Sequence, residues 1–308
     1  MALPPDDPVT DVAPTPASRS QWRDVWRQFR RHRGAMVALV LFWGIVLFVT
    51  VGPYLWRIDP TYVDIRARNQ GFTAAHPLGT DQLGRDMLAR LMKGGQVSLA
   101  VGLTAMSIAV TLGSLIGILS GFFRRLDAPL MRVTELFLAL PLLPLLLLMV
   151  TLFREPLGKV LGPGMGTFVL IVTAIGATSW MQAARIVRGD VLGLKEREFI
   201  LAARSIGTPN RRMVMRHILP NVLSPIVVAA TLGIATAIIT ESALSFLGLG
   251  FPPDFPTWGR LLYDAIEQMQ MYPWRVILPG VLISLTVLTV NYIGDGLRDA
   301  MDPRIRGR

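Results

Sequence analysis

The chain has 308 residues, of which 52% are hydrophobic and only 17% charged, and its mean hydropathy is +0.47. This apolar excess is more than a soluble core needs and indicates an integral membrane protein. The net charge of +10 would favour nucleic-acid binding in a soluble protein, but in a membrane protein it marks cytoplasmic loops, so no nucleic-acid partner is expected. The chain has no cysteine and its three histidines lack ligand-like spacing, so no bound metal or cofactor is expected.

The segment before the first apolar stretch divides into two parts. Residues 1–18 are rich in Pro, Ala and Asp and predict a disordered tail without a signal peptide. Residues 19–33 predict a basic amphipathic helix, because apolar side chains recur there at i, i+3, i+4 and i+7: Trp22, Val25, Trp26 and Phe29. Such a helix lies in the headgroup layer of a membrane. Docking against a partner protein is the alternative.

Residues 34–308 predict an all-α transmembrane domain with six spans. Six stretches without Asp, Glu, Lys or Arg approach or exceed the ~20 residues that a bilayer requires: 34–56, 94–123, 136–153, 160–184, 218–240 and 276–294. With the N-terminus placed inside, the cytoplasmic segments carry 21 of the 31 Lys and Arg residues, and the outer segments carry 10. This bias predicts that both termini are cytoplasmic and that residues 57–95 and 249–275 are extracytoplasmic.

Small residues in the second span predict close helix packing. Gly113, Gly117 and Gly121 recur at four-residue spacing. A ridge of this kind lets two helix backbones approach closely, so we interpret these glycines as packing residues rather than a substrate site.

Four further residues are candidates for gating or for the transport pathway. Pro141 and Pro144 each remove a backbone donor from the third span and can bend it. Glu135 opens that span at its cytoplasmic end, and Glu241 lies near the outer end of the fifth span. An acid at membrane depth indicates function by default. The alternative is that both acids reach water or a partner at an interface.

The longest inner connection, residues 185–217, predicts two short helices rather than an open loop. The first has an apolar stripe at i, i+3, i+4 and i+7: Phe199, Ala202, Ala203 and Ile206. Glu198 suits its first turn and Gly207 its C-terminal end. Thr208-Pro209 then predicts the start of a second helix that ends before Pro220. The stripe can fold back on the bundle or dock into a groove of another protein, and the pattern leaves both open.

Three segments carry a resemblance to a known family. Residues 196–221, EREFILAARSIGTPNRRMVMRHILPN, resemble the EAA loop of permease subunits in bacterial ATP-binding-cassette importers. The matching elements are Ala202, Ala203, Gly207, Leu219 and Pro220, whereas Leu201 stands where the motif has its leading Glu. Residues 76–94, HPLGTDQLGRDMLARLMKG, and 241–262, ESALSFLGLGFPPDFPTWGRLL, resemble the C-type permease of dipeptide, oligopeptide and nickel importers.

The resemblance implies a type I importer permease fold in the bacterial cytoplasmic membrane, with a coupling helix in the cytoplasmic loop. It implies a pore-forming subunit that moves peptides by alternating access, with nickel, opines or glycosides as alternative substrates. The implied partners are a homologous second permease, two ATPases that use ATP and Mg, and an extracytoplasmic substrate-binding protein. The residues implied to couple to the ATPases are Glu198, Phe199, Ala202, Ala203, Arg204, Ile206 and Gly207.

The chain itself is not expected to be an enzyme, because it has no G-x-x-x-x-G-K-[ST] phosphate-binding loop. An ion-coupled secondary transporter is the main rival. It would need paired ionisable groups near the middle of the membrane, and four of the six spans contain no such group. A membrane scaffold and a membrane-embedded enzyme are weaker alternatives, since no nucleophile–base pair is evident.

Overall fold

The computed structural model describes residues 21–301, except the side chains of Gln21, Trp22 and Asp24. Within that range the chain is mostly helical and forms no β-strand, apart from one isolated bridge between Thr80 and Asp86. The predicted tail, residues 1–18, and the start of the predicted helix 19–33 lie outside the described residues.

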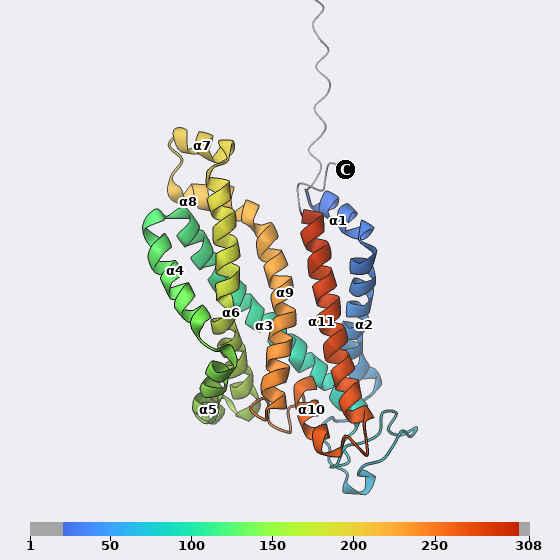
Figure 1. The fold of residues 1–308 in the computed structure, drawn as a ribbon. Coiled ribbons are helices and arrows are strands. Elements are labelled where there is room, and N and C mark those ends of the chain that lie inside the picture. The colour runs from blue at the N-terminus through green and yellow to red at the C-terminus, as the bar shows by residue number, and fades with distance from the viewer. Residues whose placement is uncertain (1–20, 302–308) are drawn as a thin grey trace, which may run out of the picture.

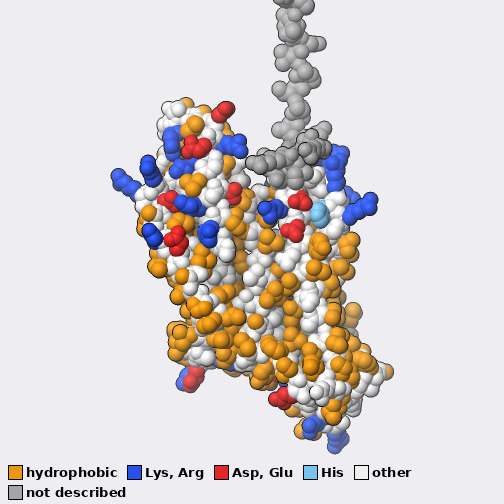
Figure 2. Space-filling view, in the orientation of Figure 1, with side chains coloured by type: hydrophobic (Ala, Val, Ile, Leu, Met, Phe, Trp, Pro, Cys, Tyr) orange, Lys and Arg blue, Asp and Glu red, His pale blue; other side chains and the backbone are white. Residues whose placement is uncertain are grey.

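Five helices in the described part of the chain are apolar and long enough to cross a membrane: α2 (Arg33–Leu55), α3 (Met87–Phe122), α6 (Pro163–Lys195), the continuous helix Asn210–Phe246 and α11 (Trp274–Met301). Hydrophobic side chains cover the middle of the molecule, while Lys and Arg gather mainly at one end (Figure 2). An all-α protein that crosses the membrane several times is therefore confirmed.

The predicted third span is broken. Two helices, α4 (Arg124–Ala139) and α5 (Leu142–Leu161), meet at an angle of 85°, so the count reaches six spans only if this pair is one. The bend that the prolines of the stretch 136–153 were predicted to allow is here a complete break in the helix. The reason is local: Leu140 precedes a proline and takes an extended conformation, and Pro141 is extended too and cannot donate to the helix.

Helix α6 is the centre of the bundle. In the most apolar 18-residue stretch of α6, 67% of the residues are buried. The corresponding share is 22–39% in the other four long helices. Helix α3 packs along it, α5 and α9 (Leu219–Phe246) flank it, and α2 and α11 stand together beyond α9 (Figure 1). The main core is formed by small and branched side chains of α3 and α6, such as Ala105, Ala109, Ile171 and Ile175.

Helix α1 (Gln21–Arg31) packs over one end of two long helices, α2 and α11. Val25 and Phe29 are buried against Ala35 of α2 and Ala300 and Met301 of α11. Part of the apolar face predicted for this helix therefore packs against the chain's own helices, whereas Trp26 on that face is half exposed.

Several short elements gather at the end of the molecule opposite α1 (Figure 1). They are η1 (Ile65–Ala67), α10 (Trp258–Ala265) and η3 (Ile266–Gln268). The segments next to them, including residues 57–86 and 248–257, have no long helix and contact the ends of α3 and α11 that lie at this end of the molecule.

The connection predicted at residues 185–217 is shorter than expected. Helix α6 continues to Lys195, and α7 (Glu198–Ser205) follows after a two-residue turn. The predicted second helix does not end before Pro220. Instead α8 (Asn210–Met213) passes through a π-helical turn, Val214–Ile218, directly into α9. Pro220 causes no break because it occupies the first turn of α9, where a missing N–H costs little.

Candidate functional site

Helix α7 has two different faces. Ile200 and Ala203 are buried against the chain's own Val191, Met213 and Ile218. The side chains of Phe199, Leu201, Ala202, Arg204 and Ile206 are exposed, and Ile206 keeps 83% of its surface. The two arrangements that the sequence leaves open therefore occur together: one face folds back on the bundle and the other is free.

The predicted docking stripe needs a correction at Ala203, whose side chain is only 7% exposed. Helical spacing places four apolar residues near one another but does not say which edge of the stripe meets the bundle. Ala203 lies at the inner edge, next to Ile200, so it holds α7 in place and is not part of the exposed face. Glu198 lies in the first turn and is exposed, as predicted for an acid at a helix N-terminus.

Gly207 ends α7 in a left-handed conformation, with φ of 77°. Its N–H donates to the carbonyl of Arg204 at 3.0 Å, and the N–H of Thr208 donates to Ala203 at 3.1 Å. This pair of hydrogen bonds is the Schellman end of a helix, which favours glycine at this position. A Cβ on Gly207 would meet no atom within 4 Å, so the requirement is conformational and not one of space.

Polar contacts tie the region before α7 to the bundle. Lys195 donates to the carbonyls of Gly121 and Phe122 at the end of α3, both at 3.1 Å. Arg188 forms a two-point ion pair with Asp127 of α4, with Nη2 to Oδ2 at 2.8 Å. The end of α6 that leads into α7 is thereby tied to α3 and α4.

The glycine ridge lies at the contact between α3 and α6. A Cβ on Gly113 would lie 2.5 Å from the carbonyl oxygen of Trp180, one on Gly117 2.7 Å from that of Ala184, and one on Gly121 2.7 Å from the Cβ of Val191. Real side chains do not approach that closely. The backbones of α3 and α6 are near each other because these three positions carry no side chain.

A cavity of about 380 Å³ lies within the membrane region, between α3, α6, α9 and the break between α4 and α5. Most of its lining is apolar, including Leu140 at the break. Four polar side chains interrupt it: Thr178, Ser179, Gln182 and Thr236. The hydroxyl groups of Thr178 and Thr236 donate to carbonyl groups of their own helices.

The residues predicted for gating do not all meet at this cavity. Pro141 forms the break beside it and Pro144 lies in the first turn of α5, but neither lines it. Glu135 is exposed on α4. Glu241 is fully buried elsewhere, where it accepts hydrogen bonds from Ser98 at 3.1 Å and Ser245 at 2.7 Å. The structure thus gives Glu241 hydroxyl partners between α3 and α9.

Residues 81–90 and 260–264, far apart in the sequence, meet in a buried ion cluster that sequence reasoning missed. We call it the outer clamp and define it by five residues: Asp81, Arg85, Arg90, Arg260 and Asp264. Arg85 and Arg90 both pair with Asp81, at 2.7 and 2.6 Å, and Arg90 also pairs with Asp264 at 3.1 Å. Asp264 accepts from Arg260 at 2.9 Å. In the sequence, the only local indication of this ion cluster is the mixture of acidic and basic residues between positions 81 and 90.

Burial alone would raise the pKa of Asp81, but the guanidinium groups of Arg90 and Arg85 and the hydrogen bonds from Arg85 outweigh it and hold that pKa below its ordinary value. The carboxylate is therefore charged at neutral pH. Beside the clamp, Trp258 is fully buried and donates from its indole to the carbonyl of Leu91 at 2.9 Å. The clamp and Trp258 fix α10 to the start of α3.

Long apolar helices, a broken helix beside a membrane cavity and a short helix with a free apolar face define a membrane transport permease. The chain belongs to the family described as binding-protein-dependent transport system inner membrane component, whose family model matches residues 109–307. Residues 20–71 match the N-terminal TM domain of oligopeptide transport permease C.

Relatives resemble the chain over nearly its whole length. The oligopeptide transport system permease protein OppC of Haemophilus influenzae is 40% identical, over 94% of this chain and 90% of that protein. OppC of Salmonella typhimurium is 41% identical, over 94% and 93%. The dipeptide transport system permease protein DppC of Alkalihalophilus pseudofirmus is 36% identical, over 98% and 94%.

Solved structures support the fold. A chain of the MetNI methionine ABC transporter, in an inward-facing conformation, matches with a TM-score of 0.57 at 20% identity, over 70% of this chain and 98% of that one. The type I importer permease fold implied by the sequence is thereby confirmed. The family membership also shows that this is a transport subunit and not an enzyme.

Proposed function

We propose that the chain is the C-type pore subunit of an ATP-driven importer that moves di- or oligopeptides into the cell. Its relatives are named oligopeptide and dipeptide transport permeases, and they match over at least 90% of this chain. The observation that carries the proposal is the free apolar face of α7, because an exposed Phe199 and Ile206 on a cytoplasmic helix need a partner to cover them.

That partner is an ATPase. An apolar helix face suits a groove on another protein, and small residues such as Ala202 allow close approach. The coupling surface consists of Phe199, Leu201, Ala202 and Ile206, with Glu198 and Arg204 at its edge and Gly207 setting its angle. The chain lacks a phosphate-binding loop of its own, so two such ATPases bind ATP and Mg and supply the energy.

The other partners follow from the orientation. The end with α1 and α7 carries most of the Lys and Arg side chains in view, which supports a cytoplasmic position for it and for both termini (Figure 2). The outer clamp then lies on the extracytoplasmic side, where a substrate-binding protein delivers the cargo. A homologous permease completes the pore.

Transport uses the break between α4 and α5. When ATP closes the ATPase pair, α7 moves as a lever, and Lys195 and Arg188 pass that movement to α3 and α4. The extended residues Leu140 and Pro141 form a hinge next to the membrane cavity. Two arrangements of this hinge open the cavity to one side or the other, which is rigid-body alternating access.

The test is a pair of substitutions on the free face of α7, Ala202→Asp and Ile206→Asp, in the assembled complex. A charge in a dry interface without a partner is strongly unfavourable. We expect both variants to reach the membrane and to lose co-purifying ATPase and peptide uptake. The control is Gly193→Asp near the end of α6, where an added Cβ meets no atom within 4 Å. Full retention of ATPase together with normal uptake in both variants would refute the coupling role of α7.

A further inference from the structure

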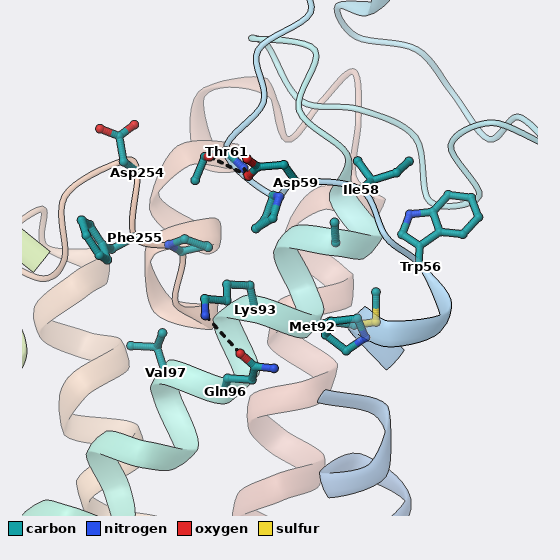
Figure 3. Close-up of a pocket in the computed structure, with 14 residues that line it drawn as sticks. Trp56, Ile58, Asp59, Thr61, Met92, Lys93, Gln96, Val97, Asp254 and Phe255 are labelled. Atoms are coloured by element: carbon teal, nitrogen blue, oxygen red, sulfur yellow. Dashed lines mark hydrogen bonds between the residues drawn. The ribbon is translucent and has the colours of Figure 1, made fainter. Parts of the chain in front are cut away.

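A second cavity opens at the extracytoplasmic end, with a volume of about 710 Å³ (Figure 3). Its walls come from the end of α2, residues 58–61, the first turns of α3 and residues 254–256. This volume lies within the range of binding sites for small molecules, roughly 300–1,000 Å³. The membrane cavity and this outer cavity share no lining residue.

The outer cavity has a preformed wall. Arg85 and Arg90 of the outer clamp both donate to the carbonyl of Pro253, at 3.2 and 3.5 Å, just before the wall residues 254–256. The prolines in this segment restrict its backbone further. On the opposite wall Trp56 donates to Asp86 at 3.1 Å. Because these contacts already fix the walls, little conformational entropy is lost when a ligand binds.

The lining combines apolar surface with charges of both signs. Trp56, Met92 and Phe255 supply apolar and aromatic surface. Asp59 and Asp254 lie toward one side of the cavity in Figure 3, and Lys93 lies toward the other. The ammonium of Lys93 is held by Gln96, with Nζ to Oε1 at 3.2 Å. A ligand that matches this surface carries an anion at one end, a cation at the other and side chains between them.

We propose that the outer cavity is a binding site for a short peptide with free termini, occupied between the binding protein and the pore. Lys93 binds the terminal carboxylate, Asp59 and Asp254 face the terminal ammonium, and Trp56 and Phe255 contact the side chains. The inference rests on the proposed function, since it takes peptides as the cargo. It adds that the permease itself contacts and selects them.

Photo-crosslinking tests contact directly. Benzoylphenylalanine replaces Phe255 in the assembled complex, and the probe is radiolabelled trialanine loaded on the binding protein. The matched control replaces Phe72, which is 61% exposed on the same side and does not line the cavity. We expect peptide label on the permease at position 255, roughly fivefold or more above position 72. Labelling no greater than at position 72, or a crosslink at position 255 to the binding protein alone, would overturn the proposal.

Uptake kinetics test the chemistry of the site. In Lys93→Ala the KM for trialanine should rise about three- to tenfold, because a charge-assisted contact to the carboxylate is lost, while the KM for trialanine amide stays unchanged. The binding protein is the same in both complexes, so the difference belongs to the permease. An equal effect on both peptides, or none on either, would overturn the site. Failure of the wild-type complex to take up trialanine would instead refute the proposed function, and this inference with it.

Discussion

Among single residues, the charges that hold α10 against the start of α3 are almost inaccessible to water. Arg90 is 1% exposed and Asp81 is 4% exposed, and each has its countercharge within 3 Å. A buried ion pair adds little stability in itself, because desolvation offsets the attraction. Removing one partner is costly, since the other charge is left buried. Arg85 and Arg90 of the clamp also donate to the carbonyl of Pro253, so disrupting the clamp would also disturb the wall of the outer cavity.

Asp81→Asn should lower the stability of the purified chain by about 3–5 kcal/mol, because Arg90 then retains only Asp264 as a countercharge. The measurement is thermal unfolding in nanodiscs. Asp254→Asn is the control, since that side chain is exposed and forms no ion pair in the described structure. Equal unfolding temperatures for Asp81→Asn and the wild type would show that the clamp has no structural role.

The pH dependence follows from the lowered pKa of Asp81. When the pKa of a carboxylate is lower in the folded than in the unfolded protein, the carboxylate stabilises the fold. This stabilisation is complete at a pH above the unfolded-state pKa. It is lost as the pH falls from there through the folded-state pKa. The unfolded value is 3.8, so the difference in stability between wild type and Asp81→Asn should be constant from pH 7 to about pH 5. It should shrink below about pH 4. A difference that grows on acidification would contradict the assignment.

At the scale of helices, the contact of α3 with α6 requires positions without side chains. Gly117→Ala places a Cβ 2.7 Å from a backbone oxygen of α6, so the helices must separate at a cost of about 1–3 kcal/mol. Gly189→Ala on α6 is the matched control, because its Cβ meets no atom within 4 Å and alanine favours a helix. We expect a lower unfolding temperature for the first variant and an unchanged or higher one for the second. The reverse order would place the ridge against lipid.

The end of α7 offers a second matched pair. Gly207→Val forces a β-branched residue into a left-handed conformation, whereas Gly207→Asn is tolerated there. ATP hydrolysis by the assembled complex should lose its stimulation by loaded binding protein in the first variant and keep most of it in the second. Equal loss in both variants would mean that the glycine is needed for space near a partner and not for its conformation.

The elements also show what the sequence could reveal. Apolar runs predicted the long helices, because a segment in lipid needs an apolar composition. Glycine spacing predicted close packing of one helix, because close contact needs small residues at regular intervals. Pro141 predicted a bend in the third span, but not that the helix stops at Leu140 and resumes at an angle of 85°, since the run of leucines continues through the break. The inner position of Ala203 could not be inferred, because the stripe does not say which edge meets the bundle. The outer clamp joins Asp81 to Asp264, and no local pattern links residues so far apart.

For the molecule as a whole, the proposed orientation has a simple test. The chain has no cysteine, so single cysteines can be introduced at exposed Ala74 and exposed Asn210. Ala74 lies in the outer segment 57–86, and Asn210 begins α8 at the end that carries α7. An impermeant thiol reagent added to intact cells should label the first cysteine and not the second. The opposite labelling would reverse the orientation.

The proposed function makes this chain a pore subunit driven by ATP hydrolysis on other chains, and not an ion-coupled carrier. The direct measurement is peptide accumulation in proteoliposomes that contain this chain, its sister permease and the two ATPases, with binding protein outside. We predict accumulation against a gradient only when ATP is present on the side of the ATPases, and none when this chain is omitted. Accumulation driven by a proton or sodium gradient without ATP, by this chain alone, would show that it is an ion-coupled carrier.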